Sequence, residues 1–263
     1  MHFRDFSCIS VAAVCLCGAP LAQADSAQGG YSVTAGFGAA IAPRYLGSSD
    51  YQVLPVPYLD VVTPEGIYID SEKGIGYKWL LPSNFFIDTS INYSLGRKDE
   101  NEAWQSGSNY LKGMGDIPGA LITTVTAGYR LGAVGDVTLS ADLPLSNRSR
   151  GDTYRVGFQY IVLQARRDRL STSAEADFGS SKYNQTFFGV DASQSASTTF
   201  PQYGVGSGLY AVRAGLTWEH QFDKHWLMSA TQQITNLTGD AVNSPIVQRR
   251  VSLLTDALVG YTF

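Results

Sequence analysis

Two histidines are the first candidates for chemistry in this sequence. His220 and His225 stand on either side of a short polar segment, and His2 is the only other histidine. If they face each other across a turn they form a weak metal site. If they lie apart they are two histidines at the edge of a membrane, which is the interpretation we favour. A serine nucleophile needs a base such as histidine beside it. Because His220 and His225 both flank a single turn, serines elsewhere in the chain have no histidine base from this pair. We therefore predict no enzymatic activity, no metal and no cofactor.

A second candidate is a set of charged residues at the polar positions of segments with alternating polarity. Both signs are present, which leaves two roles open. In the interior of a closed sheet such groups usually pair with one another, because burying a charge without a partner is costly. The alternative is a polar path lined by the same groups. The set comprises Asp88, Arg130, Asp142, Arg155, Glu175, Asp177, Arg213, Glu219 and Asp256.

The elements that carry these residues are predicted by strict alternation of apolar and polar side chains over segments of about ten residues. Residues 85–95 are the clearest case, with Ile87, Ile91 and Tyr93 on one face and Asp88 on the other. Aromatic residues cluster at the ends of such segments, as they do at membrane interfaces. The pattern predicts twelve strands, at residues 31–42, 51–62, 66–72, 74–80, 85–96, 120–131, 136–146, 154–165, 170–178, 208–220, 226–236 and 251–263.

The connections between these strands alternate in length. Short turns such as 63–66 join each even strand to the next odd one, and long segments such as 97–119 and 179–207 join odd strands to even ones. Short periplasmic turns and long external loops are typical of outer-membrane barrels. We predict an all-β, antiparallel, up-and-down transmembrane barrel of about twelve strands. Ten strands is the alternative, because Pro55 and Pro57 interrupt a ladder.

The amino-terminal end carries the features of a secretory signal. Arg4 precedes an apolar run from Cys8 to Cys17, and Ala22-Gln23-Ala24 forms a small-x-small cleavage site. The apolar run is too short to span a bilayer, which takes about 20 residues. We predict a cleavable signal peptide over residues 1–24 and a barrel domain over residues 25–263. All three cysteines lie in the segment to be removed.

The carboxy-terminal end carries a second export feature. Tyr261 and Phe263 share one face of a predicted strand with Val259. A terminal aromatic residue on such a strand resembles the signal that the barrel assembly machinery reads. Together the two ends predict a protein of the Gram-negative outer membrane that reaches it through the periplasm.

Composition excludes two further classes. The formal net charge of the chain is -4, so nucleic acid is not an expected partner. No long apolar run follows the predicted signal peptide, which excludes a helical membrane protein. A barrel is compatible with this composition because only every other residue of its strands must be apolar.

The longest connection, residues 179–207, is rich in serine, threonine, glutamine and glycine. A loop of this length in an ordered domain is often functional. Three arrangements are open: a plug in the barrel mouth, a binding site at the surface, and an exposed mobile loop. Residues 191–197 are expected to form a short helix.

Several stretches resemble the MipA/OmpV family of outer-membrane proteins, and the resemblance covers nearly the whole chain after residue 24. Phe187 stands where that family usually has a tyrosine, and Val242-Asn243 where Ala-Asp is usual. The resembling stretches are residues 42–48, 54–58, 74–77, 95–97, 187–190, 194–196 and 239–247.

The resemblance implies a non-enzymatic barrel. The family's type member is described as a scaffold that links a murein-cleaving lytic transglycosylase to a murein synthase. The expected partners are therefore outer-membrane lipid and lipopolysaccharide, the barrel assembly machinery, and a murein hydrolase or synthase. A narrow channel for small solutes and a surface adhesin are the alternative functions.

Overall fold

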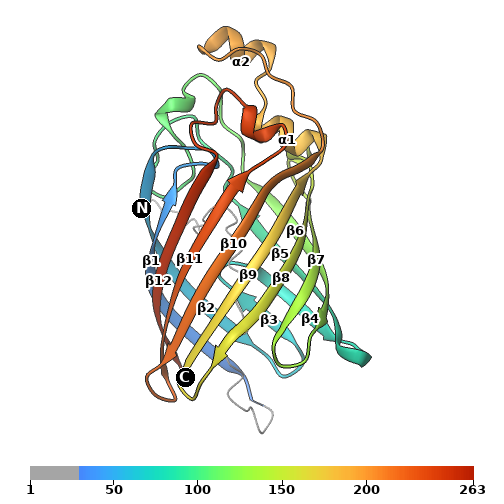
Figure 1. The fold of residues 1–263 in the computed structure, drawn as a ribbon, viewed down its shortest axis with the longest axis vertical. Coiled ribbons are helices and arrows are strands. Elements are labelled where there is room, and N and C mark those ends of the chain that lie inside the picture. Colours follow the sequence, from blue (N-terminus) through green and yellow to red (C-terminus); the bar gives the residue numbers. More distant parts are fainter. Residues whose placement is uncertain (1–29) are drawn as a thin grey trace, which may run out of the picture.

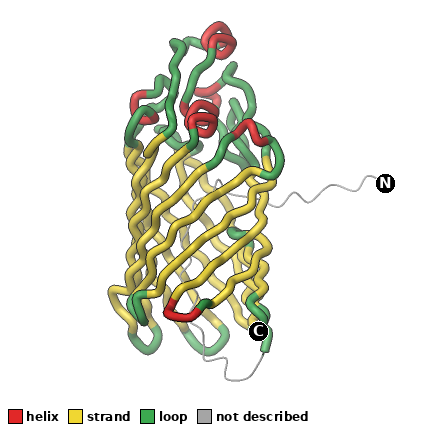
Figure 2. Tube along the Cα trace, turned by 90° about the vertical axis from the view of Figure 1, so that its right-hand side faces the viewer, coloured by secondary structure: helices red, strands yellow, loops and turns green. Residues whose placement is uncertain are grey.

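Twelve antiparallel strands form one closed barrel, in which strands that follow each other in the chain are neighbours (Figures 1 and 2). The computed structural model describes residues 30–263, so the predicted signal peptide lies outside the described residues. The twelve-strand prediction is confirmed and the ten-strand alternative is wrong. The strands are β1 (Ser32–Pro43), β2 (Tyr51–Val62), β3 (Ile67–Asp70), β4 (Gly74–Leu80), β5 (Phe85–Ser94), β6 (Ala120–Arg130), β7 (Gly135–Pro144), β8 (Thr153–Gln164), β9 (Asp168–Gly179), β10 (Gly208–Gln221), β11 (Trp226–Leu237) and β12 (Val251–Thr262).

Alternation along each strand places apolar side chains on the outside of the barrel. On β5, Ile91 and Tyr93 are 50% and 47% exposed, whereas Phe86 and Ser90 on the opposite face are each 5% exposed. Successive side chains of a strand point to opposite faces, so one face meets lipid and the other the lumen.

The ring closes between the first and the last strand. β1 pairs with β12 from Thr34↔Thr262 to Ile41↔Thr255. Hydrocarbon offers no hydrogen-bond partner, so a sheet that crosses it must satisfy its edge groups by closing on itself. Closure is therefore a condition for the barrel to reside in the membrane.

The barrel wall is incomplete at one place, which we call the notch. β2 pairs with β3 only over Asp60–Val62, and β4 pairs with β5 only as far as Ile75↔Ile91. The β3–β4 hairpin turns back at residues 71–73. In Figure 1 the labels of both strands lie in the half of the barrel that is farther from the long loops. The strand predicted over 66–72 is therefore shorter than expected, and the loop-side half of β2 has no strand partner on this side.

The edge of β2 at the notch is occupied by prolines. Leu59 accepts a hydrogen bond from the Ser71 backbone N–H and donates its own N–H to Ser71 Oγ, both at 2.9 Å. The odd-numbered residues of β2 therefore turn their backbone groups toward the notch. Pro55 and Pro57 lie on this edge and have no N–H to satisfy, which is the position where a strand tolerates proline.

The end of the notch nearest the loops is closed by residues 104–107. The Gln105 side-chain amide donates to the Leu95 carbonyl at 2.8 Å, and the Gly107 backbone N–H donates to the Arg44 carbonyl at 2.9 Å. This segment connects the end of β5 to the β1–β2 loop.

The long loops pack together into a cap over one end of the barrel (Figure 1). Residues from four loops form a buried apolar cluster of Tyr45, Leu111, Met114, Val190, Phe200 and Ile246. No helix in residues 30–263 is long and apolar enough to cross a membrane. The helical elements are α1 (Ser181–Phe188), α2 (Ala192–Ser197) and short 3-10 helices at Pro82–Asn84, Asn109–Leu111, Arg148–Arg150 and Ala241–Asn243.

The helix expected at residues 191–197 corresponds to α2. Asp191 caps it, since its carboxylate accepts the Gln194 backbone N–H at 2.8 Å. The preceding α1 was not expected, and it carries Phe188, which is only 1% exposed, beneath the cap. The 179–207 loop therefore contains two different parts. Its first helix, α1, lies over the barrel mouth and is partly buried, and its second helix, α2, is the outermost helix of the molecule (Figure 1).

Candidate binding site in the barrel lumen

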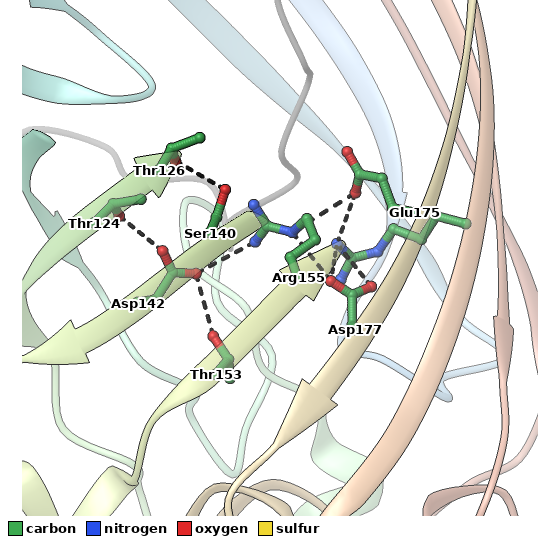
Figure 3. Close-up of polar contacts among 9 residues, drawn as sticks. Thr124, Thr126, Ser140, Asp142, Thr153, Arg155, Glu175 and Asp177 are labelled. Atoms are coloured by element: carbon green, nitrogen blue, oxygen red, sulfur yellow. Dashed lines mark hydrogen bonds and ion pairs between the residues drawn. The ribbon is translucent and has the colours of Figure 1, made fainter. Parts of the chain in front are cut away.

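Five charged side chains meet on the lumen face of β7 to β10, and we call them the ion-pair lattice (Figure 3). Arg155 lies opposite Asp177 in the β8–β9 register, and Arg213 lies opposite Glu175 in the β9–β10 register. Arg155 Nε is 3.1 Å from Asp177 Oδ1, and its Nη2 is 3.3 Å from Asp142 Oδ2. Arg213 Nη1 is 3.2 Å from Asp177 Oδ2 and 3.5 Å from Glu175 Oε2. Two guanidinium groups are thus shared among three carboxylates.

Burial makes this pairing necessary. Asp177 is 1% exposed, Glu175 5% and Arg213 8%. A charge removed from water to this degree is tolerated only beside an opposite charge and with its hydrogen bonds satisfied. The lattice therefore fixes the relative positions of four neighbouring strands, β7 to β10.

Hydroxyl groups extend the polar surface of the lattice to one further strand, β6 (Figure 3). The Thr124 hydroxyl donates to Asp142 Oδ1 at 2.7 Å, and the Thr153 hydroxyl donates to Asp142 Oδ2 at 3.2 Å. The hydroxyls of Thr126 and Ser140 are 2.8 Å apart. The continuous polar surface reaches from β6 to β10.

The structure places the other residues of the charged set outside the lattice. Arg169 Nε is 3.7 Å from Glu219 Oε2, which forms a separate pair. Asp88 accepts a hydrogen bond from the Tyr68 hydroxyl at 2.5 Å. Asp256 is 5% exposed, and its Oδ1 has no hydrogen-bond partner within residues 30–263.

Within residues 30–263, Arg130 forms no ion pair and contacts an aromatic ring instead. Its guanidinium lies 6.0 Å from the centre of the Phe86 ring, and Lys78 Nζ lies 4.3 Å from the same ring. Opposite Phe86 in the register is Gly128, where a Cβ would stand only 2.1 Å from the ring. The glycine leaves the room that the ring occupies.

A cavity of about 160 Å³, which we call the loop-side cavity, lies between the lattice and the cap. Its charged lining consists of the lattice residues Asp142, Arg155 and Arg213 together with Arg97 and Arg150 from the loops. Much of the remaining wall is apolar, including Tyr45, Leu54, Trp104, Phe187, Phe188 and Tyr210.

Arg97 and Arg150 were not singled out from the sequence. Arg97 is 4% exposed, and its Nη1 donates to the Phe187 carbonyl at 2.8 Å. Arg150 is 6% exposed, its Nη2 donates to Ser94 Oγ at 2.9 Å, and its guanidinium lies 5.3 Å from the centre of the Phe187 ring. Both arginines therefore converge on Phe187, the last-but-one residue of α1.

Burial changes the titration of these loop arginines. It lowers the pKa of Arg97 to about 10 and also lowers the pKa of Arg150. A base that loses its water is less readily charged, because the cation is the form that desolvation penalises. With a pKa of about 10, Arg97 is still a cation at neutral pH.

The two histidines lie apart from the cavity and contact different neighbours. His220 Nδ1 is 2.8 Å from Asp168 Oδ1, and His225 Nδ1 is 2.7 Å from the Thr262 carbonyl oxygen. The described residues contain no cluster of three or more histidine, cysteine, aspartate or glutamate side chains suited to a metal ion.

The carboxy-terminal aromatic residues lie on the outer face of the barrel at the end away from the cap. Phe263 is 75% exposed, and its ring meets that of Tyr261 edge-on at 5.1 Å. Tyr261 also stacks on His225 at 5.2 Å and meets Trp226 at 5.1 Å. Such a row of rings is typical of a membrane interface.

A closed ring of strands that is apolar outside and charged inside defines a transmembrane β-barrel of the outer membrane. Residues 35–263 match the family model for MltA-interacting protein MipA. The chain therefore belongs to the MipA family, and the resemblance seen in the sequence is confirmed. Its surroundings are outer-membrane lipid and lipopolysaccharide.

Characterised relatives agree with this location. The chain is 28% identical over 160 residues to outer membrane protein Omp26La of Vibrio anguillarum and 27% identical over 160 residues to outer membrane protein OmpV of Vibrio cholerae. Each alignment covers 60% of this chain and 60% of the relative, so the chain spans less than two thirds of these proteins.

Two solved structures are similar to this chain at low sequence identity. A porin refined at 1.8 Å is 10% identical with a TM-score of 0.34, covering 90% of this chain and 100% of its own. OprB of Pseudomonas putida is 11% identical with a TM-score of 0.38, covering 80% of this chain and 59% of its own.

Proposed function

We propose that this barrel is a narrow, non-enzymatic passage for small solutes across the outer membrane. The observation that supports the proposal is the loop-side cavity, which lies in the lumen between the cap and the ion-pair lattice. Its lining offers cations, hydroxyls and apolar rings, as sites for small molecules do. A lumen crossed by paired side chains passes only solutes that fit between them.

Planar-bilayer recording tests this proposal. The purified protein should give discrete current steps that are smaller than those of a general porin in the same lipid. Replacing Asp142→Ala together with Arg155→Ala removes one side of the lattice, so the unit conductance should rise. Lys98→Ala on the exposed surface of the cap is the matched control and should leave the conductance unchanged.

The folded state must be verified in the same preparation. A folded barrel migrates differently on a gel before and after boiling, because the closed sheet resists detergent until it is heated. Protein that shows this shift and yet gives no current steps would rule out the passage.

An envelope scaffold for murein enzymes is the second candidate, and the family's description as MltA-interacting protein supports it. A protein interface of ordinary size buries about 800 Å² on each partner, which is large for short turns. Arg166 and Arg167 form an exposed basic turn between β8 and β9, on the side away from the cap, and are the residues we propose for such a contact.

Capture from a periplasmic extract tests the scaffold. The wild-type barrel in detergent should retain a lytic transglycosylase, and Arg166→Glu with Arg167→Glu should reduce the amount retained. Arg148→Met, at the cap end of the barrel, should not. Equal retention by an unrelated barrel would count against the scaffold.

Export through a signal peptide over residues 1–24 remains part of the proposal. Sequencing of the mature protein should begin at Asp25, and a chain that retains residues 1–24 in the outer membrane would contradict it. Tyr261 and Phe263 are proposed as the signal for the barrel assembly machinery. Deleting Phe263 should lower the amount of heat-shifting protein in the outer membrane, whereas Phe222→Ala at a nearby turn should have a smaller effect.

A further inference from the structure

The loop-side cavity contains more positive than negative charge. Its lining carries Arg97, Arg150, Arg155 and Arg213 against a single carboxylate, Asp142. The chain as a whole has a formal net charge of -4. Glu175 and Asp177 offset Arg155 and Arg213 from behind the lining, so the excess of cations at this cavity comes from Arg97 and Arg150.

In the part of the chain that the structure describes, two of these four arginines lack a carboxylate partner. Within residues 30–263, no Asp or Glu oxygen lies within 4.0 Å of Arg97 or Arg150, whereas Arg155 and Arg213 each contact at least two carboxylates. Backbone carbonyls, one hydroxyl and aromatic rings are the neighbours of Arg97 and Arg150. These contacts use only part of each guanidinium, which has five N–H donors.

The two arginines are held close to the same residue of α1. Arg97 donates to the Phe187 carbonyl and Arg150 lies over the Phe187 ring, so both are held at the same end of α1. Both are more than nine-tenths buried and both line the loop-side cavity. A buried cation in a medium of low polarity attracts an anion more strongly than an exposed one does.

The rest of the lining restricts the shape of the anion. Phe187, Phe188, Leu54 and Trp104 form apolar parts of the wall. The cavity volume of about 160 Å³ is close to that of a cavity of roughly 150 Å³ known to hold a benzene ring. Hence a molecule with one ring-sized apolar part and one acidic group matches both the size and the chemistry.

We propose that the loop-side cavity binds a small organic acid, with its carboxylate held by Arg97 and Arg150 and its apolar part against Phe187, Phe188 and Leu54. This assigns a class of solute to the proposed passage, and it rests on that proposal in taking the lumen as the solute's route. A carboxylate suits the site because guanidinium groups bind it through paired N–H donors.

Benzoate is the probe for this site, and benzamide is its neutral counterpart of the same shape. Binding to the folded protein in detergent is measured by calorimetry and by tryptophan fluorescence. Of the four tryptophans, Trp104 lines the cavity although it is 54% exposed, and Trp79, Trp218 and Trp226 lie on the outer face and are not among the lining residues. Benzoate should bind, benzamide should bind at least about tenfold more weakly, and Trp104→Phe should abolish the fluorescence signal but not the heat.

Substitutions locate the carboxylate. Arg97→Met and Arg150→Met should each weaken benzoate binding by roughly 10- to 100-fold, which is the effect of losing a charge-assisted hydrogen bond. Arg148→Met is the matched control, because Arg148 is an exposed arginine in the same short helix as Arg150. The gel shift on boiling confirms that each variant is folded.

Three outcomes would overturn the proposal. One is equal binding of benzoate and benzamide, which removes the role of the charge. Another is equal affinity in Arg97→Met, Arg150→Met and Arg148→Met, which removes the two arginines. The third is inorganic phosphate binding as tightly as benzoate, which removes the apolar part of the site.

Failure of the site and failure of the passage are distinguishable. Current steps without benzoate binding would overturn the acid site and leave the passage intact. Benzoate binding without current steps would support the acid site as a binding site and overturn the passage.

Discussion

The four arginines that line the loop-side cavity fall into two groups that differ in what holds them. Arg155 and Arg213 lie on regular strands, where the register brings Asp177 and Glu175 opposite them. Arg97 and Arg150 lie in the loops and are held by carbonyls, a hydroxyl and aromatic rings. Carboxylate partners compensate the charge of a buried cation, and such a pair stabilises the fold. A buried cation without carboxylate partners remains uncompensated and can attract an incoming anion.

The two groups should therefore respond differently to substitution. Removing one member of a buried ion-pair network leaves an uncompensated charge inside the protein. Removing a buried cation that has no carboxylate partner leaves no such charge behind.

Asp177→Ala should have the largest effect on stability. Both Arg155 and Arg213 contact this carboxylate, so its loss should lower the free energy of unfolding by about 3–5 kcal/mol. Denaturant unfolding in phospholipid vesicles measures the change. A loss below about 1 kcal/mol would mean that Glu175 and Asp142 suffice for both arginines.

High pH should weaken the binding of benzoate. Burial lowers the pKa of Arg97 to about 10, so its cation is present below that pH and is lost as the pH rises through it. Benzoate stays an anion throughout, and its affinity should fall by up to about tenfold per pH unit above this point. Arg97→Met should lose this pH dependence, and an equally steep fall in that variant would contradict the assignment.

Arg97→Met should change stability only slightly. The substitution removes one hydrogen bond to the Phe187 carbonyl and also removes the cost of keeping a buried cation out of water. These effects oppose each other, so the free energy of unfolding should change by less than about 1.5 kcal/mol. The same vesicle assay measures it, and a loss as large as that of Asp177→Ala would make Arg97 a structural residue.

Lys98→Ala should have the smallest effect of the series. Lys98 Nζ and Asp116 Oδ2 are 2.6 Å apart, but both side chains are well exposed at the surface of the cap. An exposed ion pair contributes about 0–1 kcal/mol and is screened by salt. The free energy of unfolding of Lys98→Ala should differ little from that of the wild type at both low and high salt. A large loss of stability in this variant would mean that surface charge holds the cap in place.

The fold was readable from the sequence because its strands obey a single periodicity. The strand predicted over 85–96 begins where β5 begins and ends two residues beyond it, and the long connections predict where the loops gather. The strand predicted over 66–72 is shorter in the structure, because residues 71–73 form the turn between β3 and β4. Alternation reports which face a side chain takes and says little about where pairing stops.

The sequence predicts the strand residues of the candidate site but not its loop residues. Arg155 and Arg213 occupy polar positions of alternating segments, so periodicity brings them to attention together with Glu175 and Asp177. Arg97 lies in an irregular loop, where neither spacing nor periodicity indicates burial. Its environment depends on α1, which packs against it from ninety positions further along the chain.

The prolines of β2 also bear on how copies of this protein meet one another. A strand with free N–H and C=O groups is a template onto which another chain adds as an extra strand. Along the stretch that β3 does not reach, Pro55 and Pro57 remove two donors, and Ser71 occupies both backbone groups of Leu59. A second polypeptide approaching this margin finds no continuous ladder to extend, so a shortened hairpin is compatible with a molecule that stays separate in a crowded membrane.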